Sequence, residues 1–228
     1  MKRILSFVLV LMFAVSITAC SKKGTAAPTA ETNGASVADK ETAEVFSSSI
    51  DEIVANAGEG KAEKNEDSQN KLTGLAVVRI IDFTGDNKPE LVTVYSDEFD
   101  SEIYWMEISG FDYGTASLKF SDDSTKLMIT SKSSEEASGP CIWFYTDERG
   151  DNYFVVGDDL SKSADFYRYV QMDGGEKCYK FMKDFTIEGG NFPEGTYDKI
   201  EFVGMSDEDV EKNFEKNQQA IDAINSKK

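Results

Sequence analysis

Residues 74–97 read GLAVVRIIDFTGDNKPELVTVYSD, and this stretch decides the fold that the sequence predicts. Two runs rich in Val, Ile and Leu, at 74–82 and 90–97, flank a short segment of turn-forming residues. Such runs are typical of β-strands. A connection this short forces antiparallel neighbours, because a parallel crossover needs a dozen or more residues. Since the run at 91–95 is apolar on both faces, we expect it to be a central strand.

The same pattern of short apolar and aromatic runs between Gly, Asp, Asn and Ser clusters continues to Met205. We predict strands at 74–82, 90–97, 102–110, 115–121, 125–131, 141–147, 152–157, 164–172, 176–186 and 197–204. Residues 146–151 and 173–175 predict hairpin turns, where glycine supplies positive φ. The charged stretch 59–71 lacks any large apolar residue, so we expect a solvated loop there.

A helix is predicted at each end of this β-rich region. Apolar residues recur at helical spacing within 39–57, where Asp39 suits the N-cap and Gly58 the stop. After the capping-box sequence Ser206-Asp207-Glu208-Asp209, a second apolar stripe follows and is interrupted by Asn217. The sequence therefore predicts an α+β fold. We expect a mostly antiparallel β meander, as one curved sheet or two packed sheets, flanked by N-terminal and C-terminal helices.

Composition excludes several classes of function. The chain has 228 residues and a formal net charge of −18, so its surface repels phosphate backbones and no nucleic-acid partner is expected. It contains no histidine, which excludes Ser-His and Cys-His nucleophilic machinery and His-ligated zinc or copper. No catalytic motif replaces them, which favours a protein that is not an enzyme.

The first twenty residues carry the features of an export signal. Lys2 and Arg3 precede an apolar run at 4–15, which is too short and too soon followed by polar residues to span a membrane stably. The ending Ile17-Thr18-Ala19-Cys20 resembles the lipobox of bacterial lipoproteins. This resemblance implies cleavage before Cys20 and a thioether link from Cys20 to diacylglycerol. The alternative is an ordinary secretory signal with an incidental cysteine.

We therefore expect a lipoprotein signal peptide at 1–19, a flexible tether at 20–38 and a single β-rich extracytoplasmic domain at 39–228. Acyl chains on Cys20 would partner the membrane and hold the protein at the cell membrane or cell surface. Inner and outer membranes both remain open as the location.

One segment carries recognisable chemistry. The sequence Asp82-Phe83-Thr84-Gly85-Asp86-Asn87-Lys88-Pro89-Glu90-Leu91 places side-chain oxygens at loop positions 1, 3, 5 and 9, and the Lys88 carbonyl at position 7. A loop that curls around a hard cation needs this spacing. The candidate metal ligands are Asp82, Thr84, Asp86, Lys88 and Glu90.

This segment resembles the calcium loop of FG-GAP and related surface proteins, and a wider set of bacterial lipoproteins that carry one such loop in a β-rich domain. The resemblance implies Ca²⁺ as a cofactor, with an affinity of about 10⁻⁴ to 10⁻³ M. Three residues depart from the pattern: Thr84 is a neutral ligand, Asn87 replaces a glycine, and Thr93 at position 12 excludes a full EF-hand. A bare turn with an Asx bond at Asp82 explains the same residues without a metal, so both interpretations stay open.

Two cysteines, Cys141 and Cys178, remain beyond the lipobox. A disulfide between them is chemically allowed outside the cytoplasm. It requires Cα atoms within about 7 Å, and hence a closed or reordered sheet. Two reduced, buried cysteines are the alternative.

The sequence leads to a non-enzymatic binding or interaction module whose ligand or protein partner is not identified. The alternative is an extracytoplasmic glycan hydrolase with paired carboxylates, for which residues 97–102 supply four acids. A solute receptor of a transporter is disfavoured because strand–helix alternation is missing. Aromatic residues between 143 and 179 predict core and cross-strand pairs, with an exposed sugar-stacking stripe as the alternative.

Overall fold

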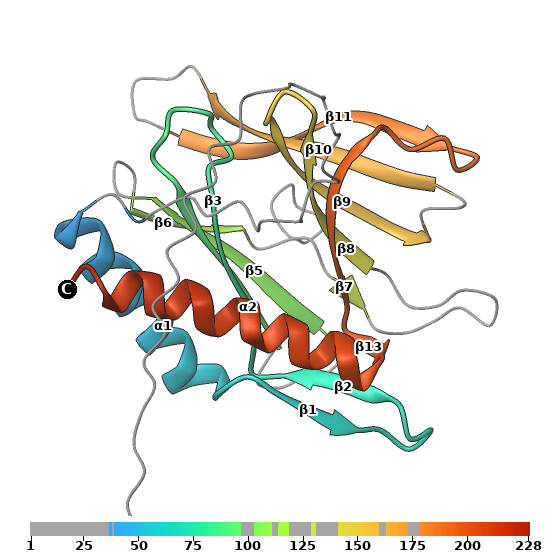
Figure 1. Ribbon diagram of the computed structural model, residues 1–228, viewed down its shortest axis with the longest axis horizontal. Helices are drawn as coiled ribbons and strands as arrows, with labels where there is room; N and C mark the ends of the chain where they lie inside the picture. Colours follow the sequence, from blue (N-terminus) through green and yellow to red (C-terminus); the bar gives the residue numbers. More distant parts are fainter. Residues whose placement is uncertain are drawn as a thin grey trace, which may run out of the picture. The chain divides into compact units, whose positions relative to one another are not determined.

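The computed structural model describes residues 37, 39–96, 103–110, 114–118, 129–130, 141–159, 163–172 and 178–228 (Figure 1). Its two helices are α1 (Lys40–Ala57) and α2 (Asp207–Asn225). Its strands are β1 (Lys61–Lys64), β2 (Asn70–Thr73), β3 (Leu75–Ile81), β4 (Glu90–Ser96), β5 (Ile103–Gly110), β6 (Gly114–Leu118), β7 (Ile129–Thr130), β8 (Cys141–Asp147), β9 (Asn152–Asp159), β10 (Ser163–Met172), β11 (Cys178–Glu188), β12 (Gly195–Glu201) and β13 (Val203–Met205).

The strands form three antiparallel sheets. One sheet has the order β3-β4-β5-β6, with β7 paired to β5, and is called the β3–β6 sheet below. A second, called the β8–β12 sheet, has the order β11-β10-β9-β8-β12. A small third sheet has the order β1-β2-β13. The predicted α+β fold with a helix at each end is confirmed, and β4 is central in its sheet as expected.

The structure corrects two local predictions. The stretch 59–71, predicted as a solvated loop because it lacks large apolar residues, contains β1 and the first two residues of β2, which form a hairpin. This hairpin is held by pairing with β13 from the far end of the chain, which local composition does not reveal. The single strand predicted at 197–204 is divided into β12 and β13, which belong to different sheets.

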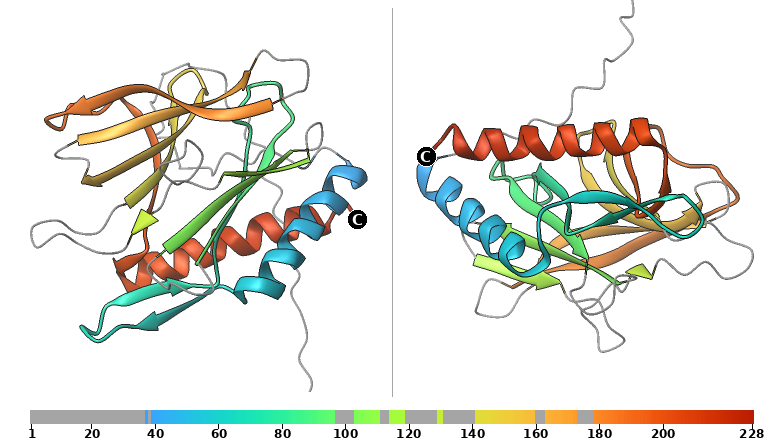
Figure 2. Two further views of the ribbon diagram at one scale, coloured as in Figure 1. Left: turned by 180° about the vertical axis from the view of Figure 1, so that it is seen from behind. Right: turned by 90° about the horizontal axis from the view of Figure 1, so that it is seen from below.

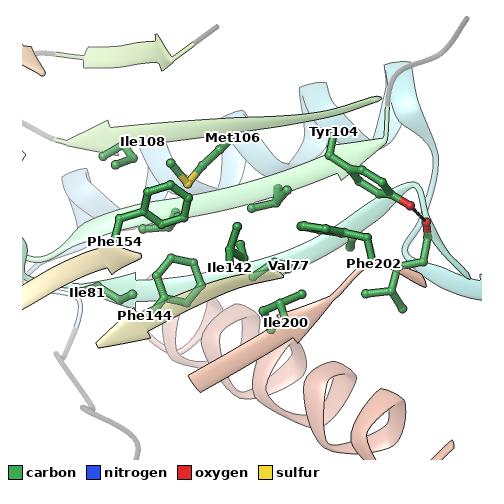
Figure 3. Close-up of a cluster of buried hydrophobic side chains, with 14 of the residues drawn as sticks. Val77, Ile81, Tyr104, Met106, Ile108, Ile142, Phe144, Phe154, Ile200 and Phe202 are labelled. Atoms are coloured by element: carbon green, nitrogen blue, oxygen red, sulfur yellow. Dashed lines mark hydrogen bonds between the residues drawn. The ribbon is translucent and has the colours of Figure 1, made fainter. Parts of the chain in front are cut away.

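The main core lies between the β3–β6 and β8–β12 sheets (Figure 3). Val77 and Met106 from the first sheet meet Phe144 and Phe154 from the second. At one end of this core the ring of Tyr104 stacks on Phe202 at 4.1 Å, and its hydroxyl donates to the Leu72 carbonyl. Burial also raises the pKa of Tyr104, which keeps its hydroxyl as a donor.

The helices cover the other face of the β3–β6 sheet. Phe46 and Ile50 of α1 and Ile224 of α2 pack against β3 and β4 in a second apolar cluster (Figure 2). Both predicted N-caps are confirmed: Asp39 accepts the Thr42 N–H at 2.8 Å and Ser206 accepts the Asp209 N–H at 3.1 Å. The N-caps therefore set where the helices begin, and the packing of their apolar faces against the sheet stabilises them.

The aromatic residues of the second sheet belong to the interior. Trp143, Tyr145, Tyr153 and Phe166 are buried and form a third cluster, on the face of the β8–β12 sheet opposite the main core. Phe166 stacks on Phe185 at 4.6 Å between ring centroids. For these residues the prediction of core packing is confirmed, and a sugar-stacking stripe is not available to them.

Candidate functional site

Residues 82–87, called turn 1 below, connect β3 toward β4 and are organised by the carboxylate of Asp82. Its Oδ1 accepts the Gly85 N–H and its Oδ2 accepts the Asn87 N–H, each at 2.8 Å. Gly85 and Asn87 have φ of 71° and 63°, a left-handed conformation that glycine and asparagine tolerate best. Gly85 and Asn87 therefore suit these positions, because the backbone must adopt a left-handed conformation to wrap around the Asp82 carboxylate.

The structure brings together three of the five predicted calcium ligands. Thr84 Oγ1 lies 3.3 Å from both Asp82 Oδ1 and Glu90 Oε1. Glu90 is only 2% exposed, and its Oε2 accepts the Phe83 N–H at 2.8 Å. Positions 1, 3 and 9 of the loop thus offer oxygens to one small volume, two of them from carboxylates, as Ca²⁺ prefers.

The other two predicted ligands are arranged differently. Asp86 is exposed, and its Oδ1 accepts the Lys88 N–H at 2.8 Å, so this carboxylate is engaged inside the turn. Over the described ranges, no group of three or more Cys, Asp and Glu residues is arranged to hold a metal ion. The donor set at turn 1 is therefore two carboxylates and a hydroxyl, a partial match to the predicted loop.

A second turn repeats the motif of the first. Residues 147–152, called turn 2 below, read DERGDN and join β8 to β9, while turn 1 reads DFTGDN; both fit D-x-x-G-D-N. Asp147 Oδ1 accepts the N–H groups of Arg149 and Asp151, each at 2.9 Å. Gly150 has a φ of 91°. Sequence reasoning identified this segment only as a hairpin turn, and the repeated motif is the signal that would have found it.

Each turn joins two strands that line the same core, although the connections differ in length: Ile81 pairs with Glu90 across turn 1 and Thr146 with Asn152 across turn 2. Val77 and Ile142 each precede the first Asp of their turn by five residues, and both lie in the core between the sheets. On the following strands Val92 and Phe154 occupy the same core. The meanders β3–β4–β5–β6 and β8–β9–β10–β11 therefore face each other with the same side inward, each opening with a D-x-x-G-D-N turn.

A cavity of about 380 Å³ lies where the two turns meet. The Asn152 Nδ2 donates to the Asp82 carbonyl at 2.7 Å and joins the turns directly. The wall is formed by residues 82–86 of the first hairpin, 150–152 of the second and 168–170 of β10. Residues 65 positions apart in sequence thus contribute to a single cavity, whose volume falls in the range of small-molecule sites, about 300–1,000 Å³.

The charges around this cavity are of both signs. Arg168 of β10 makes ion pairs with Asp184 at 3.0 Å and with Asp151 at 3.4 Å, and its guanidinium carbon lies 4.8 Å from the centre of the Tyr153 ring. A hydrogen bond with the Tyr153 hydroxyl raises the pKa of Arg168, so its positive charge is secure. Asp82 and the other wall carboxylates provide the opposite charge beside it.

Turn 2 contains a cation of its own. Arg149 pairs with Asp147 at 2.9 Å and with Asp151 at 3.2 Å. Desolvation acts to raise the pKa of Asp147, but the N–H groups of Asp151 and Arg149 and the Arg149 guanidinium together hold that pKa below its ordinary value. The Asp147 carboxylate is therefore stabilised in its charged form.

The hydrolase alternative gains no support from the described residues. Its four acids at 97–102 lie outside them. A general acid for glycosidic cleavage needs a raised pKa. The pKa is instead lowered at five described carboxyl groups, those of Asp39, Asp147, Asp165, Asp198 and Asp207.

The strand order does not bring Cys141 and Cys178 together. Cys141 begins β8 and Cys178 begins β11, with β9 and β10 between them. Three strand spacings amount to about 14 Å, well beyond the limit of about 7 Å for a disulfide. Cys141 is buried, and its sulfur lies 3.6 Å from Glu201 Oε1.

Cys20 and the remainder of 1–36 lie outside the described residues, so the signal peptide and the lipid anchor stay predictions. The tether predicted at 20–38 is wrong at its C-terminal end, because Val37 is buried in the apolar cluster beneath the helices. In the described part of the chain, no helix has both the length and the apolar character needed to cross a membrane. Comparison with protein-family models, with curated proteins and with solved structures finds no match. Function must therefore be inferred from the residues of the site.

Proposed function

We propose that this chain is a lipid-anchored extracytoplasmic binding module that holds a small polar ligand, without covalent chemistry, between turn 1 and turn 2. The observation that carries this proposal is the cavity of about 380 Å³ built by both copies of the D-x-x-G-D-N motif. A fixed charge of each sign at its wall, Arg168 and Asp82, suits a ligand with several polar groups.

Binding is favoured over catalysis by the chemistry of the wall. The whole chain contains no histidine. The cation at the wall, Arg168, is engaged with carboxylates and with a tyrosine hydroxyl, which fixes its position but removes it from proton transfer. Such groups orient a ligand well and exchange protons poorly.

Calcium is the second part of the proposal. Asp82, Thr84 and Glu90 would hold the ion at turn 1. There it would neutralise two carboxylates that lie close together, one of them buried. The support is the shared volume reached by three oxygens, and the role is to stabilise the wall of the cavity.

The location outside the cytoplasm is supported by the sequence of residues 2–20. The variant Cys20→Ser removes the acceptor sulfur, so the protein should stay unlipidated, keep its uncleaved signal and migrate as the larger precursor. A Cys141→Ser variant is the matched control and should remain membrane-associated. Membrane retention of a cleaved Cys20→Ser protein would contradict the anchor.

The cavity is tested by amide NMR of residues 20–228 carrying Cys20→Ser. Titration with free amino acids, and separately with mono- and disaccharides, should shift the amide signals of Gly85, Gly150 and Asp151 together. Shifts confined to other parts of the surface, or none with any of these probes, would contradict the site.

The calcium proposal has its own readout. Excess CaCl₂ should raise the melting temperature and EDTA should reverse the change. Glu90→Gln should abolish the response, whereas Glu148→Gln, an exposed acid of turn 2, should preserve it. An equal response in both variants would assign the effect to general screening.

A further inference from the structure

The outer edge of β3 is covered by side chains of α2 in place of another strand. Within the described residues β3 pairs with β4 alone, and the backbone groups of Ala76 and Val78 point away from β4. Asn217 Oδ1 accepts the Val78 N–H at 2.9 Å, and Asn217 Nδ2 donates to the Ala76 carbonyl at 3.0 Å. Asn213 Nδ2 donates to the same carbonyl at 2.9 Å.

The match between helix and strand has a geometric basis. A side-chain amide offers one carbonyl and one N–H group, as a peptide group does. Asn213 and Asn217 are one helical turn apart, about 6 Å, which is close to the two-residue repeat of a strand, about 6.6 Å. The interruption of the apolar stripe at Asn217 is thus explained, because that position faces a strand edge that needs hydrogen bonds.

Arg79 holds this arrangement from within the sheet. It is 7% exposed, and its guanidinium donates to Asn217 Oδ1 at 2.6 Å, to Asn213 Oδ1 at 2.8 Å and to Asp198 Oδ2 at 2.7 Å. Lys216 of α2 pairs with the same Asp198 carboxylate. The attachment of α2 to β3 is therefore a polar network with its partners satisfied.

Apolar contacts accompany the polar network, because Val210 and Phe214 of α2 pack against the main core and Ala220 and Ile224 belong to the second cluster. The buried residues of α2 are Asn213, Asn217, Ala220 and Ile224, so half of them are amides. Water can replace amide hydrogen bonds when the helix leaves, whereas it cannot replace apolar packing.

We propose that α2 is a detachable cover of the β3 edge, which opens as one cooperative unit while the rest of the β3–β6 sheet stays folded. Opening exposes the N–H and C=O groups of Ala76 and Val78, the groups through which an edge strand accepts another strand. Local opening of this kind has its own free energy, lower than that of global unfolding.

Hydrogen exchange of residues 20–228 with Cys20→Ser tests the proposal without any change in α2. In low concentrations of urea, the amide of Val78 and the amides of α2 should share one opening free energy and exchange at least about tenfold faster than the Val92 amide of the central strand. Exchange of Val78 and α2 only with global unfolding, at the rate of Val92, would overturn the proposal.

A variant pair gives a second measurement. Asn213→Ala/Asn217→Ala should speed exchange at Val78 by about tenfold or more, with little change at Val92. The matched control is Gln218→Ala/Gln219→Ala, two exposed positions on the same helix, and should leave Val78 unchanged. Equal exchange at Val78 in the two double variants would also overturn the proposal.

Discussion

Turn 1 and turn 2 share a motif but differ in how their charges are balanced. In turn 2 the cation is built in, because Arg149 pairs with both Asp147 and Asp151. In turn 1 the residue at the Arg149 position is Thr84, and among the described residues Asp82 has no ion-pair partner. Turn 1 adds a second carboxylate, that of Glu90, beneath the first.

The Asp82 carboxylate accepts N–H groups three and five residues further on, whereas the Asp147 carboxylate accepts those two and four residues further on. This difference teaches that one sequence motif can form two different turns with two electrostatic roles. Both turns need their first Asp to accept backbone N–H groups, so the motif is a property of the chain's conformation. Whether the turn also attracts an external cation depends on two features: the residue at its third position, Thr84 or Arg149, and the presence of a second carboxylate such as Glu90 next to the first Asp. The comparison predicts that turn 1 responds to calcium and that turn 2 does not.

The largest effect is expected at the base of turn 1. Glu90→Ala removes the acceptor of the Phe83 N–H and leaves a cavity in a buried site, which should lower the free energy of unfolding by about 2–3 kcal/mol. Urea denaturation measures this loss. Glu148→Ala, exposed in turn 2, is the control and should change stability by less than about 0.5 kcal/mol.

Replacing the first Asp of each turn tests the comparison directly. Asp82→Ala and Asp147→Ala each remove two backbone hydrogen bonds and should each cost about 1–2 kcal/mol. Only Asp82→Ala should abolish the calcium-dependent rise in melting temperature. Loss of that rise in both variants, or in neither, would break the distinction between the turns.

Acid stability sharpens the role of turn 2. Because the pKa of Asp147 is lower in the folded state than its unfolded value of about 3.9, its stabilisation is fully present above that value and is lost as the pH falls through the folded pKa. Asp147→Asn should therefore lose less stability than the unchanged protein between pH 5 and pH 2, by urea midpoints. A parallel loss in both proteins would remove Asp147 from the acid response.

The smallest change in stability is expected from Arg149→Thr, which gives turn 2 the third residue of turn 1. Arg149 is largely exposed, with a side chain 71% accessible, so its ion pairs contribute about 0–1 kcal/mol. Calorimetry should nevertheless detect weak calcium binding at turn 2 in this variant. Its absence would mean that the second carboxylate, Glu90 in turn 1, is the deciding ligand.

Local patterns predicted much of this molecule. The strands around turn 1, both N-caps and the antiparallel pairing follow from short-range rules that the residues of 74–97, Asp39 and Ser206 obey. Asp82, Thr84 and Glu90, three of the five residues predicted as metal ligands, lie together because they belong to one loop. The approach of Arg168, Tyr169 and Asn152 to that loop was not predictable, since they come from distant strands.

The sequence by itself determined most of the strands, though not the hairpin β1–β2, together with where the helices begin and that one loop gathers oxygens around Asp82. Only the tertiary structure decided that turn 1 and turn 2 share a cavity, that β13 pairs with β2, and that Asn217 completes the edge of β3. The physical reason is the sequence separation over which each kind of interaction acts. Caps, turns and alternation act over a few residues, whereas the partner of a strand edge is chosen among all the segments that the folded chain can bring beside it.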